Sequence, residues 1–176
     1  MISIAKYNFS HFEDLVHYQL PPEQALYAPD PMQWFNGNTP LLESSMTAIS
    51  ILKNLRAVGF FILDRGEDKL EYTNNPQSIL LRSFSINPLY QGQGIAKATM
   101  LPGLLEKFIY QLAPSCNEIV LAVNPANQLA YQLYLKCGFL EAGKMVMSRR
   151  GTLCAALYRP IPTSTSIIAT IENKSS

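Results

Sequence analysis

The sequence predicts one folded domain of the mixed α/β class. Its 176 residues fall within the usual size of a single domain. Hydrophobic residues make up 48% and charged residues 15%, a balance typical of a folded chain. Short apolar runs of strand type also alternate with a segment of helical periodicity at residues 94–113. We therefore expect one domain over residues 1–160, followed by a tail over residues 161–176.

The first 40 residues give weaker signals. Ile2 to Lys6 alternates apolar and polar residues and predicts a strand, and Ser10 is a candidate N-cap for a short helix. From Leu20 to Pro40, five prolines interrupt regular structure and leave short helical turns at 23–27 and 31–35. We expect this segment to form a lid over another part of the domain.

Three strands are predicted in the middle of the chain. The runs at 48–52 and 57–63 are rich in β-branched and aromatic residues and are joined by four residues, which indicates an antiparallel hairpin. Residues 64–75 are polar and loop-like, and Ser78 to Ile86 is the next strand. Asn87-Pro88 ends that strand, because proline cannot donate to a ladder and holds its predecessor extended.

A long amphipathic helix is predicted over Gly94 to Ala113. Pro102 interrupts this pattern and should kink the helix, because proline removes one backbone hydrogen bond at a cost of about 3 kcal/mol. The apolar residues recur at spacings of three and four, on one helical face: Ile95, Ala98, Leu101, Leu105, Phe108 and Leu112.

A buried strand is predicted at Glu118 to Val123, followed by a second helix. Asn124-Pro125 has the composition of a helix start, and we expect the helix to reach Cys137. Gly138 is well placed to end it in the left-handed conformation.

The chain closes with a predicted hairpin of residues 139–148 and 152–158. In the tail, the isoleucines at 167, 168 and 171 could form a small strand, or the tail could be mobile.

The composition of the chain argues against several classes of binding partner. The formal net charge is +1 with mixed signs along the chain, so neither nucleic acid nor an anionic membrane is an expected partner. Three cysteines and two histidines give no zinc-ligand spacing, which predicts no metal and a reduced, cytoplasmic setting. No signal peptide and no window of about 20 apolar residues is found, so we expect a soluble, unexported protein.

One short segment has the pattern of an anion-binding site. Gln91 to Ala96 joins a strand to a helix through Gly92 and Gly94, an arrangement in which backbone N–H groups and the helix dipole meet an anion. Such a turn can also be purely structural. A dinucleotide fingerprint would need glycine at Lys97, and a P-loop would need a Gly-Lys-Ser/Thr ending, so neither motif fits.

The segment resembles the GNAT acetyltransferase superfamily, whose signature [RQ]-x-x-G-x-[GA] is matched by Gln91, Gly94 and Ala96. The resemblance covers residues 78–139, and Leu20 to Tyr27 resembles a subgroup of bacterial small-amine acetyltransferases. A second motif of the family is matched in the same order by Asn127, Ala130, Tyr134, Gly138 and Phe139.

The resemblance implies a fold and a cofactor site. The fold is a central, mostly antiparallel mixed sheet of six to seven twisted strands, flanked by about four helices and splayed between its fourth and fifth strands. The cosubstrate is acetyl-CoA, whose pantetheine arm pairs with the strand backbone like an added strand. The implied binding residues are Phe84, Ser85, Ile86, Gln91, Gly92, Gln93, Gly94, Ile95, Ala96, Lys97, Asn127 and Tyr134. Asn127 could equally be a helix cap, and Lys97 could simply face solvent.

The resemblance also implies a reaction, acetyl transfer to a primary amine, most simply of a small molecule, by direct attack in a ternary complex. It places Tyr134 beside the CoA sulfur as the proton donor. The alternative is that Tyr134 is only a core residue. Tyr131 is interpreted as a packing residue. Because the strand 78–86 holds no Asp or Glu, we expect a water relay as the general base. If Arg82 is buried, its guanidinium needs a partner of opposite charge. Cys137 is interpreted as a packing residue and not as a nucleophile.

Other interpretations stay open at this point. A non-catalytic CoA-binding or sensing module would keep the phosphate turn, and a protein amine could be the acceptor. Trp34 and Phe35 could wall the acceptor site or belong to the core. Either a monomer or a homodimer is compatible with the sequence. Acidic residues of the first quarter suggest a cationic acceptor such as a polyamine, or are solvated surface charge: Glu13, Asp14, Glu23, Asp30 and Glu43.

Overall fold

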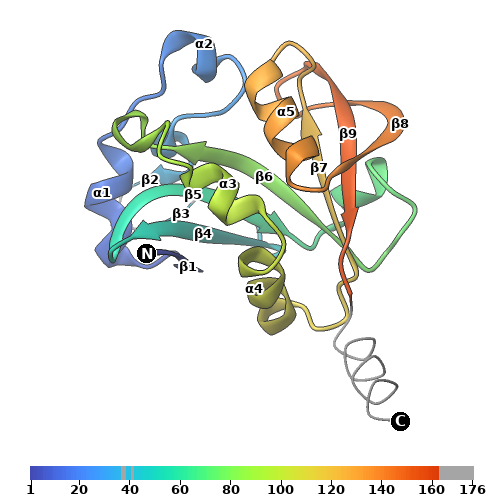
Figure 1. Cartoon of the computed structure of the whole chain (residues 1–176), viewed down its shortest axis with the longest axis horizontal. Helices are drawn as coiled ribbons and strands as arrows, with labels where there is room; N and C mark the ends of the chain where they lie inside the picture. Colours follow the sequence, from blue (N-terminus) through green and yellow to red (C-terminus); the bar gives the residue numbers. More distant parts are fainter. Residues whose placement is uncertain (37–38, 41, 163–176) are drawn as a thin grey trace.

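The computed structural model describes residues 1–36, 39–40 and 42–162. Within them, seven strands form one sheet and two short strands form another (Figure 1). The large sheet has the order β1-β4-β5-β6-β7-β9-β8. Its strands are β1 Ile2–Lys6, β4 Met46–Lys53, β5 Arg56–Asp64, β6 Ser78–Ile86, β7 Glu118–Val123, β8 Leu140–Met147 and β9 Leu153–Pro160, while β2 Phe35–Asn36 pairs with β3 Thr39–Pro40.

The helices of the described chain are short. The α-helices are α1 Phe12–Val16, α2 Pro22–Ala25, α3 Ile95–Met100, α4 Leu104–Leu112 and α5 Gln128–Lys136. The 3-10 turns are η1 Phe9–His11, η2 Pro31–Gln33, η3 Glu67–Glu71 and η4 Pro88–Tyr90.

The large sheet is mixed and splayed, as predicted. The pair β6–β7 is parallel, and the neighbouring strand pairs are antiparallel. The two parallel strands pair only over three positions, from Ser78 opposite Glu118 to Leu80 opposite Val120. Beyond Leu80, the remaining residues of β6 have no partner in β7 among those described. Since β6 and β7 are the fourth and fifth strands of the sheet in chain order, the splay lies where the family resemblance implied.

Each face of the sheet packs its own core. Residues alternate along β5, so that Phe61 and Leu63 join one cluster while Phe60 and Ile62 join the other. The first cluster packs against α3, α4 and α5, which lie across the sheet in Figure 1. The second packs against α1 and the proline-rich segment that follows it. We call these the helix face and the lid face. Phe35 is fully buried on the lid face, where Trp34 packs beside it, so both aromatics belong to this core.

The predicted long helix is wrong in one respect, because it is two helices. Leu101 has an extended backbone with ψ 149°, and α4 begins only at Leu104. Proline disfavours the helical conformation of the residue before it, and Gly103 then has φ +125°, which suits glycine. Pro102 therefore breaks the helix where a kink was expected.

Two predicted helix starts also shift. The side chain of Asn8, and not that of Ser10, caps the first helical segment by accepting from Ser10 N. At α5 the cap is Asn127, whose Oδ1 accepts from Ala130 N at 3.3 Å, whereas Asn124 closes a turn by accepting from Ala126 N at 2.9 Å. An Asn-Pro pair fits either a helix start or a turn, and here it forms the turn.

The end of the described chain stays on the body of the domain. Ile161 is buried, and its N–H donates to Asn117 O at 2.9 Å. The expected tail strand and tail mobility concern residues 163–176, which lie outside the described residues. None of the helices in the described ranges has the length and hydropathy that a membrane span requires.

Candidate functional site

A cavity of about 330 Å³ occupies the gap between the splayed strands. Leu81 to Ile86 of β6 and Leu121 to Val123 of β7 line it on either side. Side chains from α3 and α5 line one end, including Ala96, Ala130, Leu133 and Tyr134. The proline-rich lid and the β8–β9 turn line the rest, including Leu20, Gln24, Tyr27, Ala28, Ser148 and Arg150.

The cavity passes through the sheet. Leu81 lies opposite Leu63 and therefore points to the helix face, whereas Arg82 lies opposite Ile62 and points to the lid face. Ser85, opposite Phe60, also belongs to the lid face. The cavity thus joins a chamber under α3 and α5 to a chamber under the lid, which we call the helix chamber and the lid chamber.

The glycine turn lies at the start of α3. Gly92 and Gly94 have φ +72° and +75°, in the left-handed region, and a Cβ at either position would meet no atom within 4 Å. Glycine is therefore required by backbone conformation, while the space in front of the turn is open. Ile95 is buried in the core, and Gln93 and Lys97 are exposed. Of residues 91–97, only Gln91 and Ala96 line the cavity, and the two glycines lie outside its lining.

The side chain of Gln91 has a structural task. It exchanges two hydrogen bonds with Gln24 of α2, at 3.0 and 2.9 Å, and its Nε2 also donates to Ile86 O at 2.8 Å. These bonds tie the lid to the end of β6. The match of Gln91 to the glycine signature did not reveal this, because its partner lies 67 residues away in the sequence.

The backbone of β6 is bent beside the cavity. Ser83 has φ +55°, and the register with β5 shifts between Phe60 and Ile62, which marks a β-bulge. Asn87 N donates to Val58 O of β5 at 2.8 Å. Because successive residues direct their backbone groups to opposite edges of a strand, Ile86 and Phe84 direct theirs toward the gap. Ser85 presents its side chain instead, and its Oγ is 2.6 Å from the hydroxyl of buried Tyr18.

Tyr134 lies in the wall of the helix chamber. Its side chain is buried and packs edge-on against Phe139, with ring centroids 5.6 Å apart. Burial raises the pKa of the Tyr134 phenol well above its ordinary value, and the neighbouring Cys137 thiol adds to the rise. The hydroxyl therefore keeps its proton throughout the physiological range. Tyr131 instead hydrogen-bonds the Glu141 carboxylate outside the cavity.

A buried ion pair fixes the ends of the helices around this chamber. Arg159 of β9 pairs with Glu106 of α4 at 2.5 Å and donates to Met100 O and Cys137 O at 2.5 and 2.6 Å. Its guanidinium also lies 4.6 Å from the centre of the Phe139 ring, which packs on Tyr134. Arg159 therefore holds the C-terminal ends of α3 and α5 in place. Cys137 is buried there as a packing residue.

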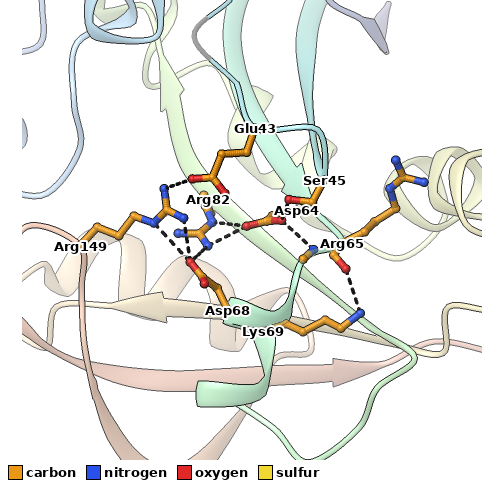
Figure 2. A network of polar contacts seen from close by, with 9 residues as sticks. Glu43, Ser45, Asp64, Arg65, Asp68, Lys69, Arg82 and Arg149 are labelled. Atoms are coloured by element: carbon orange, nitrogen blue, oxygen red, sulfur yellow. Dashed lines mark hydrogen bonds and ion pairs between the residues drawn. The ribbon is translucent and has the colours of Figure 1, made fainter.

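The partner of Arg82 lies on the neighbouring strand. Arg82 donates to Asp64 at 2.7 and 2.9 Å and to Asp68 at 2.7 Å. Figure 2 shows Arg149 of the β8–β9 turn reaching the same Asp68 carboxylate, with Glu43 on its other side. This network fixes the β8–β9 turn against the lid face, and its members come from five separate segments.

The network sets the ionisation of Asp64. Burial alone would raise the pKa of this carboxyl, but hydrogen bonds from Gly66 N and Ser45 Oγ and the Arg82 guanidinium outweigh burial and lower it. The folded-state pKa is thus below that of the unfolded chain. The stability contributed by the ionised Asp64 is complete above the unfolded value and is lost as the pH falls through the folded one.

We expect Asp64→Asn to lower the midpoint of urea unfolding at pH 7 and to have a smaller effect at pH 3, below the ordinary pKa of an aspartate, where part of the stability from the ionised carboxyl is lost. Urea titrations of both proteins at the two pH values test this. An equal loss at pH 7 and at pH 3 would mean that the asparagine disturbs packing and that the charge of Asp64 is unimportant.

Among the residues that the structure describes, no group of three or more His, Cys, Asp or Glu side chains is arranged to hold a metal ion.

Known proteins share the fold and part of the sequence. A 97-residue segment is 45% identical to an uncharacterized N-acetyltransferase, YbbJ of Bacillus subtilis (strain 168), and covers 54% of this chain and 59% of that relative's length. The solved structure of AAC(6')-Ib with ribostamycin and coenzyme A is 16% identical, with a TM-score of 0.70 over 94% of this chain and 95% of the other. A chimeric spermidine N-acetyltransferase, SpeG of Vibrio cholerae with hSSAT, is 17% identical, with a TM-score of 0.59 over 90% and 95%.

At these identities the two solved structures show that the fold is shared. The model of the acetyltransferase (GNAT) family matches residues 11–139, a range that contains the glycine turn, the splayed strands and Tyr134. The chain therefore belongs to the acetyltransferase (GNAT) family.

Proposed function

We propose that this chain transfers the acetyl group of acetyl-CoA to a primary amine of a small molecule, by direct attack in a ternary complex. The observation that carries the proposal is the cavity through the sheet, with the glycine turn and Tyr134 beside one chamber and the lid over the other. Two substrates can enter such a cavity from opposite faces and meet at the splay. Family membership supports the same reaction.

The residues of the helix chamber fit coenzyme A. The open space in front of Gly92 and Gly94 would admit phosphate oxygens to the backbone N–H groups at the start of α3. The backbone groups of Phe84 and Ile86 face the gap, where amides of a pantetheine arm could pair with them. Asn127 and Ala96 line the same chamber. Acetyl-CoA would supply the activated thioester there.

Groups of the chain itself can polarise the thioester carbonyl and protonate the departing thiolate, which are two requirements of acetyl transfer. Backbone N–H groups at Phe84 and Ile86 are the donors available to polarise a carbonyl in the gap. The Tyr134 hydroxyl holds a proton that it can donate to a departing thiolate, since burial keeps the phenol neutral. We assign Tyr134 as the general acid on this basis.

The described wall of the cavity offers neither a carboxylate nor an imidazole to act beside these groups. The described residues that line the cavity include no Asp, Glu or His, so we propose that water or bulk solvent takes the proton of the amine. The fraction of free amine then depends on the pKa of the amine itself. We expect kcat/KM to rise with pH up to that pKa and to shift when the amine is exchanged for a less basic one. A fixed inflection near pH 6–7 for all amines would contradict this.

The glycine turn offers a separate test. Gly94→Val should lower coenzyme A affinity at least about tenfold, because the side chain enters the space reserved for phosphate and a left-handed valine is strained. Gly143→Val is the matched control, since Gly143 has φ +71° and equally open surroundings but lies on β8, away from the start of α3. Calorimetry with coenzyme A measures both. Equal losses in the two variants would mean that strain alone was responsible.

The function itself is tested by thiol release. Purified protein with acetyl-CoA and a panel of small primary amines should release free thiol at a rate that depends on the amine. Calorimetry with coenzyme A, done in parallel, separates the alternatives. Binding without thiol release from any amine would indicate a CoA-binding module, and no binding would overturn the site.

A further inference from the structure

The cavity wall carries positive charge without a matching negative one. Among the described residues that line it, the charged side chains are those of Arg82 and Arg150. Both lie on the side of the lid chamber, where Arg82 points to the lid face and Arg150 belongs to the β8–β9 turn. An acceptor that enters this chamber therefore meets guanidinium groups.

Arg82 is already neutralised. It is 12% exposed and bonds to Asp64 and Asp68, whose carboxylates lie within 2.7 Å of its Nη2. Its role is structural, because two carboxylates satisfy the donors of its fork.

Arg150 differs from Arg82 in having no such partner. No hydrogen bond or ion pair joins its guanidinium to any of the described side chains. The turn that carries it is nevertheless well held, since Ser148 N donates to Thr152 O at 2.8 Å and Gly151 N to Ser148 O at 2.9 Å. The preceding Arg149 anchors the turn to Glu43 and Asp68 (Figure 2). A fixed turn thus presents, at the mouth of the lid chamber, a cation that none of the described side chains pairs with.

The acidic residues that suggested a cationic acceptor are placed elsewhere. None of Glu13, Asp14, Glu23, Asp30 or Glu43 lines the cavity. Asp14 pairs with Arg56, Glu13 with His17 and Glu43 with Arg149. The Asp30 carboxylate accepts from Leu20 N and so shapes the lid. The polyamine hypothesis therefore has no carboxylate in the described cavity to support it.

We propose that the acceptor amine also carries a compact anionic group, a carboxylate or a phosphate, and that Arg150 binds this group. The inference rests on the proposed acetyl transfer and specifies its acceptor. A guanidinium matches the planar oxygens of a carboxylate and the oxygens of a phosphate through paired N–H donors. Bound in this way at the mouth, the acceptor would direct its amine inward to the splay.

Matched pairs of amines test the proposal. Leucine, lysine and phenylalanine are compared with isoamylamine, cadaverine and phenethylamine, which lack only the carboxylate, and glucosamine 6-phosphate is compared with glucosamine. Spermidine serves as a polycation. We expect kcat/KM, calculated on the concentration of unprotonated amine, to be at least about tenfold higher for the best anionic amine than for the analogue that lacks its anionic group. Equal or greater activity with the decarboxylated amines, the unphosphorylated sugar or spermidine would overturn the proposal.

Variants assign the effect to one residue. Arg150→Gln should raise KM for the anionic amine about tenfold or more, with little change for the analogue that lacks the anionic group. Arg150→Lys should recover part of the loss, and Arg65→Gln, an exposed arginine outside the cavity lining, should change neither value. A rise in the KM of acetyl-CoA in Arg150→Gln would instead place the arginine on a phosphate of the cosubstrate and contradict the proposal.

A binding measurement keeps the two proposals separable. Calorimetry of the same amines into protein saturated with coenzyme A needs no turnover. Preferential binding of the anionic amines that is lost in Arg150→Gln supports the acceptor class even if no thiol is released, in which case only the acetyl transfer fails. Binding indifferent to the anionic group overturns the acceptor class, whatever the thiol assay shows.

Discussion

Replacing Tyr134 by phenylalanine is expected to lower kcat by about 10²–10³-fold, within the range that a positioned general acid contributes. The substitution removes one oxygen and keeps the ring that packs edge-on against Phe139. The departing thiolate would then have to take its proton from water. Since burial raises the pKa of the Tyr134 phenol, the wild-type rate should also show no loss from its ionisation between pH 7 and pH 9.

Two controls define this result. Tyr131→Phe should keep the wild-type rate, because the Tyr131 hydroxyl bonds to Glu141 outside the cavity. Coenzyme A affinity should change little in Tyr134→Phe, which calorimetry measures. A Tyr134→Phe protein that binds coenzyme A normally and releases thiol as fast as wild type would remove Tyr134 from the mechanism.

The largest loss of stability should follow from breaking the ion pair of Glu106 and Arg159. Their side chains are 9% and 5% exposed, and the second oxygen of Glu106 accepts from Gly103 N at 2.5 Å. Glu106→Ala leaves a buried guanidinium without its counter-ion. We expect the free energy of unfolding to fall by about 3–5 kcal/mol, the usual penalty for removing one partner of a buried pair. Urea titration of both proteins measures the difference.

The second partner supplies the control. In Glu106→Ala/Arg159→Met no charge is stranded, so this double variant should be more stable than Glu106→Ala alone, although Met100 O and Cys137 O lose a donor. Glu13→Gln, in the exposed pair with His17, should leave the urea midpoint unchanged. If Glu106→Ala unfolds at the wild-type midpoint, the pair does not anchor the helix ends.

Local patterns in the sequence were enough to predict most of the strands and helices of the fold. The hairpin of β4 and β5 was predicted from two apolar runs, and its turn residues Asn54 and Leu55 indeed have φ +51° and +71°. Gly138 ends α5 with φ +85°, as its place after an apolar helix suggested. These features depend on neighbours within a few residues, which a sequence displays directly. Helix starts near Asn8 and Asn127 were misplaced by a few residues, because several capping side chains competed for each start.

Only part of the candidate site could be predicted from the sequence. The glycine turn and Tyr134 were singled out by their match to the family signature, and the structure places the turn at the start of α3 and Tyr134 in the cavity wall. Their roles in binding and catalysis stay predictions. Three other features depend on residues that are far apart in the chain, so no spacing rule reveals them. These are the bond of Tyr18 to Ser85, the tie of Gln24 to Gln91, and the bridge from Arg82 through Asp68 to Arg149. The sequence indicated that a buried Arg82 needs a partner, and the sheet register supplies it.

The charge of the lid chamber illustrates the same limit. Counting acidic residues in the first quarter of the chain suggested a cationic acceptor, but none of the five lines the cavity, and four of them have partners elsewhere. No pattern in the sequence pointed to Arg150 as a binding residue, because an arginine in a polar turn is usually a solvent-exposed surface residue. Its relevance comes from the turn being fixed beside the splay.

A structure of the protein with coenzyme A bound tests the central claim most directly. The account predicts that the pyrophosphate contacts the backbone N–H groups of residues 91–96, that the pantetheine arm pairs with Phe84 and Ile86, and that the sulfur lies within hydrogen-bonding reach of the Tyr134 hydroxyl. Coenzyme A bound elsewhere, or with its sulfur remote from Tyr134, would contradict it.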